Sequence, residues 1–132
     1  LSEIQVFFMG LVNIIEKKHR KRSKYSRVIC GVMDYIAKNY RDANLSVGQI
    51  ADHFNLSATY LNVLFKQEMD ITLKRYLSDY RIDHAKKLLK NSFYKITDIC
   101  ELCGYNNSNY FAKVFKEATG LTPLEYRRQN AQ

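Results

Sequence analysis

The stretches "YLNVLFKQEMDITLKRY" (Tyr60–Tyr76) and "YFAKVFKEATGLTPLEY" (Tyr110–Tyr126) decide the fold, because they are two copies of one pattern. Aligned without a gap, they share Tyr, Phe, Lys, Thr and Tyr at the same offsets. Most other pairs are conservative, such as Leu64 with Val114. Each copy of an internal repeat is one structural unit, so we expect two similar units in this chain.

The composition is that of an ordinary globular protein. A chain of 132 residues can form one domain, or two small subdomains that share a linker. No apolar run approaches the length of a membrane span, so no membrane association is expected. Three cysteines without a secretion signal predict a reduced, cytoplasmic protein. The chain starts without Met or a basic leader and is therefore expected to be a piece of a longer protein.

The net charge of +8 suggests a nucleic-acid partner, but most of that charge lies at one end. Residues 1–27 hold seven Lys/Arg against two Glu, a charge of +5 that leaves only +3 for residues 28–132. Net charge alone is therefore no evidence that the repeat binds DNA. That evidence must come from the pattern of residues in the repeat.

We treat residues 1–27 as an N-terminal linker helix with a basic run, separate from a domain at residues 28–132. Leu1, Ile4, Phe8, Leu11 and Ile15 follow a helical spacing over two heptads, too short to establish a coiled coil. A homodimer through residues 1–20 is one expectation. Packing against a missing upstream domain or against residues 28–40 is equally compatible with the spacing.

The first copy of the repeat completes a helix, a short turn and a second helix. A helix is predicted with an apolar face from Val28 to Ala37. A second helix is predicted to begin after Ser46, because Ser46 and Gln49 have the spacing of a capping box. Asn55 suits a left-handed turn, and Ser57 suits the N-cap of a further helix over roughly Ala58–Glu68.

The second copy, "ITDICELCGYNNSNYFAKVFKEATG", repeats this arrangement with Gly104 in the place of Asn55 and one extra residue in the turn. The segment between the copies, "TLKRYLSDYRIDHAKKLLKN", has apolar residues on more than one side, as a helix packed on a different partner at each end requires. No β-type alternation of useful length occurs. The predicted class is all-α, with two helix-turn-helix subdomains joined by a long connecting helix.

In a helix-turn-helix unit, the second helix lies in the DNA major groove. The face opposite the predicted core carries short polar side chains, amides and cations that suit base edges, and a Val or Ala that can touch a thymine methyl group. In the first unit these are Thr59, Asn62, Val63 and Lys66, and in the second Ser108, Asn109, Ala112, Lys113 and Lys116. Simple solvation of these faces is the alternative. The function would then be a protein-interaction or dimerisation module with only non-specific DNA affinity.

The stretch "GYNNSNYFAKVFKEATGLTPLEYR" resembles the second helix-turn-helix of the AraC/XylS family of bacterial transcription regulators. "LSVGQIADHFNLSATYLNVLFKQ" and "YRIDHAKKLL" also match, so the resemblance covers about residues 28–128. It implies a sequence-specific DNA-binding transcription regulator that inserts two recognition helices into adjacent major grooves. Its implied partners are double-stranded DNA and RNA polymerase.

The resemblance places base contacts on the first recognition helix at Thr59, Asn62 and Val63, and on the second at Ser108, Asn109 and Lys113. The sequence departs from the family at Asp70, where Gly is usual, and Asp tolerates the left-handed region better than most residues. It also departs at Val63, a place often held by a longer polar residue.

Other residues have supporting roles. Lys66 and Lys116 project towards the rim and suit DNA phosphates, while Phe65 and Phe115 belong to the core. Arg81 is expected to pair with an acidic neighbour or to position the two subdomains, and a direct contact with DNA is the less favoured alternative.

The "CELC" motif (Cys100–Cys103) raises the question of a metal or redox role. A zinc site needs two further ligands, and His53, His84 and Cys30 show no matching spacing. A thioredoxin-type motif needs a βαβ setting. Cys100 is therefore interpreted as a small buried side chain, and no metal, cofactor or enzymatic activity is expected.

Overall fold

The computed structural model describes residues 25–91 and 93–130, and these residues are helical with short connections. The predicted N-terminal stripe, and most of the basic run, lie outside the described residues. Within them no strand occurs and no helix is long and apolar enough to cross a membrane. The helices are α2 (Arg27–Asn39), α3 (Val47–His53), α4 (Ala58–Met69), α5 (Leu73–Asn91), α6 (Ile96–Leu102), α7 (Ser108–Thr119) and α8 (Pro123–Asn130).

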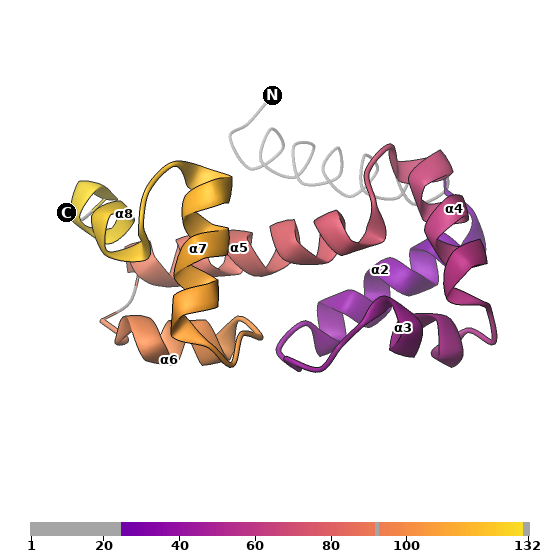
Figure 1. The fold of residues 1–132 in the computed structure, drawn as a ribbon, viewed down its shortest axis with the longest axis horizontal. Helices are drawn as coiled ribbons and strands as arrows, with labels where there is room; N and C mark the ends of the chain where they lie inside the picture. Colours follow the sequence, from indigo (N-terminus) through magenta and orange to yellow (C-terminus); the bar gives the residue numbers. More distant parts are fainter. Residues whose placement is uncertain (1–24, 92, 131–132) are drawn as a thin grey trace, which may run out of the picture.

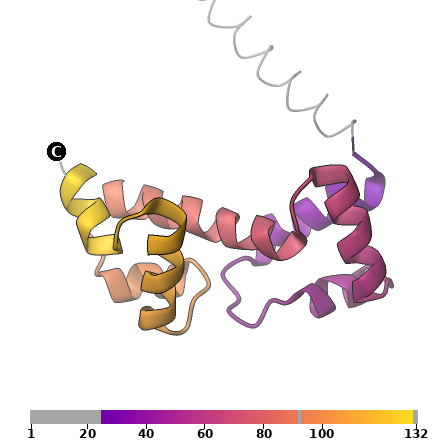
Figure 2. The same cartoon turned by 45° about the horizontal axis from the view of Figure 1, so that its top comes forward.

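Helix α5 connects two subdomains that lie at its two ends (Figures 1 and 2). The first subdomain contains α2, α3 and α4, and the second contains α6, α7 and α8. Leu73 and Leu77 of α5 belong to the first core, whereas Ile82, Ala85 and Leu89 belong to the second. The predicted all-α fold, with two helix-turn-helix subdomains and a long connecting helix, is confirmed.

The two copies of the sequence repeat adopt the same local structure. Phe65 and Phe115 are fully buried, and each makes an edge-on contact with the tyrosine eleven residues later, at ring-centroid distances of 5.4 and 5.3 Å. Each recognition helix ends at a left-handed residue, Asp70 at φ 62° and Gly120 at φ 81°. The departure from Gly at residue 70 therefore leaves the turn intact, as expected.

The turns follow the predicted chemistry. Asn55 and Gly104 both have positive φ, at 56° and 91°. Five residues separate α6 from α7 but only four separate α3 from α4, which confirms the longer second turn. The Ser46 hydroxyl accepts a hydrogen bond from the Gln49 amide at 3.2 Å.

Helix α4 ends at Met69, which agrees with the predicted extent of roughly Ala58–Glu68. One detail of the predicted helices was wrong. Ala37 is exposed, because the buried stripe of α2 runs through Ile29, Val32 and Ile36 and the next residue turns about 100° away from it.

Candidate nucleic-acid interface

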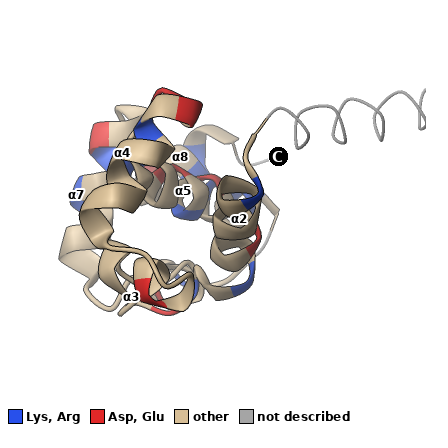
Figure 3. Ribbon diagram, turned by 90° about the vertical axis from the view of Figure 1, so that its right-hand side faces the viewer, with Lys and Arg blue, Asp and Glu red and all other residues tan. Residues whose placement is uncertain are grey.

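Helices α4 and α7 are the second helices of the two units, and both begin with a capped turn. The Ser57 hydroxyl accepts from the Tyr60 amide at 3.1 Å, and the Asn107 side chain accepts from the Tyr110 amide at 3.0 Å. Such N-caps satisfy one of the free amides of the first turn and fix where the helix starts. The two helices lie near opposite ends of α5 (Figure 1), and in the end view of Figure 3 both lie on the same side of it.

The buried residues of these helices fix which faces point to solvent. Leu61 and Phe65 are buried in α4, and Phe111 and Phe115 are their counterparts in α7. The six residues predicted to contact bases are all exposed; they are Thr59, Asn62, Val63, Ser108, Asn109 and Lys113.

The two exposed faces differ in chemistry at equivalent positions. Thr59 of α4 corresponds to Asn109 of α7, and Val63 to Lys113. Val63 is 52% exposed, although valine is usually buried. The α7 face can therefore form more hydrogen bonds, whereas the α4 face offers an apolar surface such as a thymine methyl group contacts.

Ser108 is the residue whose setting differs most from the other five. It is the first residue of α7, and its hydroxyl is close enough to the Cys100 thiol to lower the pKa of that thiol. Burial nevertheless raises the pKa of Cys100, and the contact with Ser108 offsets this only in part. The Cys100 thiol also donates to the Tyr105 carbonyl at 3.3 Å, so Cys100 is a packed core residue, as predicted.

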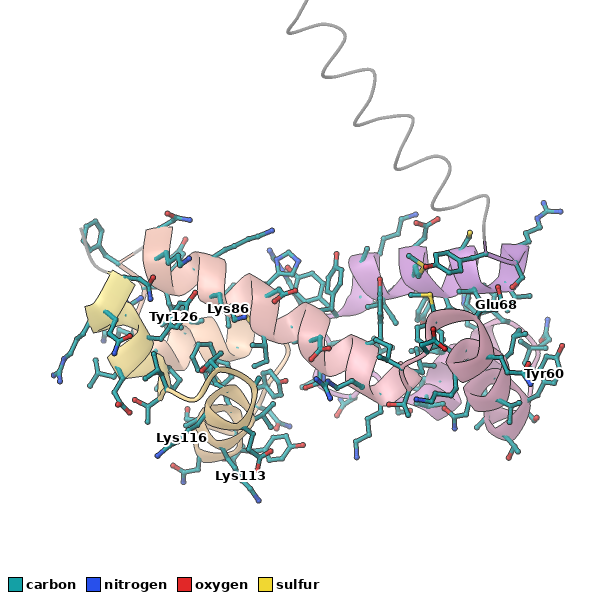
Figure 4. All side chains as sticks on the ribbon, turned by 90° about the horizontal axis from the view of Figure 1, so that it is seen from above. Tyr60, Glu68, Lys86, Lys113, Lys116 and Tyr126 are labelled. Atoms are coloured by element: carbon teal, nitrogen blue, oxygen red, sulfur yellow. The ribbon has the colours of Figure 1, made fainter. Side chains whose placement is uncertain are left out.

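The predicted phosphate contacts occupy the last turns of the recognition helices. Lys113 and Lys116 project from the side of α7 that faces away from α5 (Figure 4). Lys66 lies at the matching position of α4, and its ammonium group donates to the Asp70 carbonyl at 3.0 Å. That bond helps to close the end of α4, where carbonyl groups lack partners within the helix.

Arg81 of α5 fixes the relative position of the two units. Its Nε donates to the Tyr40 carbonyl at 3.0 Å and its Nη2 to the Asp42 carbonyl at 2.8 Å, both in the first subdomain. Its guanidinium carbon lies 5.5 Å from the ring centroid of Tyr105 in the second subdomain. Of the two predicted roles, positioning the subdomains is the one observed, and the atoms that Arg81 contacts are backbone carbonyls rather than a carboxylate.

Gly104 of the second unit lies against Arg81 and the Tyr40 carbonyl, at the junction of the two subdomains. A Cβ placed there would lie 2.1 Å from the Tyr40 carbonyl oxygen and 2.8 Å from Arg81 Nε. The sequence indicated the positive φ of Gly104 but not this close approach. Nothing local in the sequence signals it, because the contacting loop lies more than sixty residues earlier.

Charge on the described ribbon is mixed rather than gathered into one basic face. In the end view of Figure 3, acidic and basic residues alternate around the first subdomain. The charge pattern in this view therefore does not by itself mark a nucleic-acid-binding face.

Two helix-turn-helix units with exposed recognition faces on one side of a connecting helix define a bipartite DNA-binding domain. Residues 50–129, more than half of the chain, match the family of helix-turn-helix domains. The chain belongs to the AraC-type helix-turn-helix family of transcription regulators, and the resemblance stated above is confirmed.

Relatives and solved structures agree with this assignment. The transcriptional activator RhaR of Yersinia pseudotuberculosis is 34% identical over 121 residues, which cover 88% of this chain and 42% of RhaR. The C-terminal domain of AraT, a response regulator of Geobacillus stearothermophilus, is 31% identical with a TM-score of 0.81, over 83% of this chain and 90% of that domain. An AraC-type regulator of Chromobacterium violaceum is 25% identical with a TM-score of 0.68, over 89% and 97% of the two chains.

The chain is thus the DNA-binding domain of a transcription regulator, a class of DNA-binding proteins and not of enzymes. It spans well under half the length of the curated relatives that it matches.

Proposed function

We propose that this domain recognises its operator by placing α4 and α7 in two successive major grooves on one face of the duplex. One observation supports the proposal: α4 and α7 lie on the same side of α5 in the end view (Figure 3), and Arg81 bonds the first unit while it lies over Tyr105 of the second. Two recognition helices held at a fixed spacing suit the DNA major groove, which recurs on one face of the duplex at every helical turn, about 34 Å. A single chain would then contact both groove segments.

Within this proposal the two helices divide the recognition unequally. Asn109 and Lys113 lie one helical turn apart on the exposed face of α7, near its start. An asparagine can bond adenine through two atoms and a lysine can bond guanine. In α7, Ser108 directly precedes Asn109 and is a shorter polar contact. Helix α4 contributes Thr59, Asn62 and Val63, which have less hydrogen-bonding reach.

Lys66 and Lys116 act on phosphates rather than bases. A phosphate contact sets the register of the protein on DNA and makes binding depend on salt, but it carries no sequence information. In free protein the Lys66 ammonium bonds the Asp70 carbonyl, so a phosphate would compete with or share that bond. Lys116 is the matched comparison in the second unit.

The test is a binding titration of four variants on a site selected from random DNA and on a scrambled duplex. Asn109→Ala and Lys113→Ala are expected to cost about 1–3 kcal/mol on the selected site and to relax base preference there. Lys66→Ala and Lys116→Ala are expected to weaken binding to both duplexes equally and to reduce the salt slope by about one unit each. Equal losses on both duplexes for Asn109→Ala and Lys113→Ala would remove α7 as the helix that reads sequence.

The whole regulator is proposed to contact RNA polymerase and to dimerise through residues 1–20. The relative RhaR is named a transcriptional activator, and activators act on the polymerase. The helical spacing of Leu1, Ile4, Phe8, Leu11 and Ile15 supports the dimer contact. Sedimentation of a shortened chain that starts near Lys24 tests it, since a dimer that persists unchanged would exclude residues 1–20.

A further inference from the structure

A cleft of about 340 Å³ lies between the two subdomains, on the side where α7 begins. The loop before α3 forms one wall, α5 forms the floor, and the turn before α7 forms the other wall. Two cationic side chains line it, and no carboxylate does. The lining residues with polar side chains are Ser46, Lys74, Ser78, Arg81, Tyr105, Asn106 and Tyr110.

A second cleft between α5 and α7, of about 410 Å³, has the opposite charge character. It lies against the later part of α7, at Val114, Glu117 and Ala118. Its two cations are paired, Arg75 with Asp79 at 3.2 Å and Lys86 with Asp83 at 3.8 Å, and Glu117 adds a further negative charge. The cleft beside the start of α7 is therefore lined by cations without carboxylates, whereas the cleft beside the end of α7 has more carboxylates than cations.

The basic cleft adjoins the face proposed to read bases. Tyr110 directly follows Asn109 in α7 and points about 100° around the helix from it, into the cleft. Its side chain is 53% exposed. Lys74 is exposed on α5, whereas Arg81 is 8% exposed and already bonded to two carbonyls at the floor.

We propose that this basic cleft binds a phosphate of the DNA backbone segment that joins the two major grooves. The Lys74 ammonium and the Tyr110 hydroxyl are the direct donors, and Arg81 adds positive charge from below. The inference rests on the proposed function, because a duplex read by both α4 and α7 must pass its backbone over the space between the subdomains. Charge complementarity selects the occupant: the basic cleft attracts phosphate, and the acidic cleft farther along α7 repels it.

The contact of Lys74 and Tyr110 with this phosphate would thus depend on the distance between the two groove segments and not on the identity of any base. A phosphate held between the two readers fixes their distance along the duplex, as backbone contacts do in general. An operator whose two segments are displaced would lose this contact as well as one set of base contacts.

The experiment combines protein variants with neutral phosphate analogues in the full chain. Lys74→Gln and Tyr110→Phe are titrated on the selected site, and Lys87→Gln is the matched control, an exposed lysine on α5 about 20 Å farther along. Single methylphosphonates are then placed at each backbone position between the two groove segments. Lys74→Gln is expected to weaken binding about fivefold at 0.15 M salt and to lower the salt slope by about 0.9, with a smaller loss for Tyr110→Phe.

One methylphosphonate position should weaken the wild-type protein and leave Lys74→Gln unaffected, which identifies the phosphate that Lys74 contacts. Equal behaviour of Lys74→Gln and Lys87→Gln at every position would overturn the cleft assignment while the two-groove function stands. Failure of the wild type to distinguish the selected site from the scrambled duplex would overturn both. Saturable binding of pyrophosphate to the DNA-free protein that Lys74→Gln abolishes would assign the cleft to a small phosphate ligand and overturn the DNA contact.

Discussion

Gly104→Ala should destabilise this domain by more than its backbone strain alone, because Gly104 touches the junction of the two subdomains. The matched control is Gly120→Ala. Both glycines have positive φ, 91° and 81°, but a Cβ at Gly120 meets nothing within 4 Å. The same atom at Gly104 would lie 2.1 Å from the Tyr40 carbonyl oxygen and 2.8 Å from Arg81 Nε.

The magnitudes follow from these two environments. A left-handed backbone costs a residue with a Cβ about 1–2 kcal/mol, and this is the whole expected loss for Gly120→Ala. At Gly104 the added methyl must also displace the Tyr40 loop or Arg81. A hydrogen bond to a charged group contributes about 1.5–3 kcal/mol, so losing one of the two Arg81 bonds brings the total to about 3–5 kcal/mol.

Urea denaturation of both variants measures the free energies of unfolding, and DNA titration measures the consequence for function. Gly104→Ala is expected to lose more affinity for a site with two groove segments than for a duplex carrying only one, since each unit remains folded around its own core. Equal losses of stability in the two variants, with unchanged preference for the two-segment site, would refute the role given to this junction.

Two further predictions concern titration and thiol reactivity. Burial, Lys87 and Arg41 lower the pKa of His84, so the unfolded chain binds the proton at a higher pH than the folded chain does. The free energy of unfolding should therefore fall as the pH drops below about 6.5. Denaturation of His84→Gln at several pH values should show a smaller pH dependence. Burial raises the pKa of Cys103 to about 11, and Cys100 is buried beside it. Both thiols should therefore resist iodoacetamide in the native protein and react once urea unfolds it, as mass spectrometry can follow. Reaction of either thiol in the native protein would contradict their placement in the second core.

The fold could be predicted from the sequence because its determinants are local and written twice. Phe65 and Phe115, the left-handed Asn55 and Gly104, and the caps at Ser57 and Ser46 each follow from residue type and spacing. The exposed recognition faces also followed, since knowing the buried face of a helix fixes the opposite one.

The junction could not be predicted in the same way. The Arg81 bonds join α5 to carbonyl groups about forty residues earlier, and backbone carbonyls carry no sequence signature. The pairing of Ser108 with Cys100 likewise depends on how α6 and α7 pack. Tyr110 was part of the repeat, but its position beside the basic cleft depends on the arrangement of both subdomains around α5.

The most direct test of the central claim is hydroxyl-radical footprinting of the full chain on its selected site. Two recognition helices on one side of α5 predict two protected segments on one face of the duplex, separated by about one helical turn, with a protected backbone between them. Asn109→Ala should weaken protection of the segment that α7 occupies more than that of the other. Protection confined to a single groove segment, unchanged by substitutions in one of the two helices, would contradict the claim that both units bind DNA.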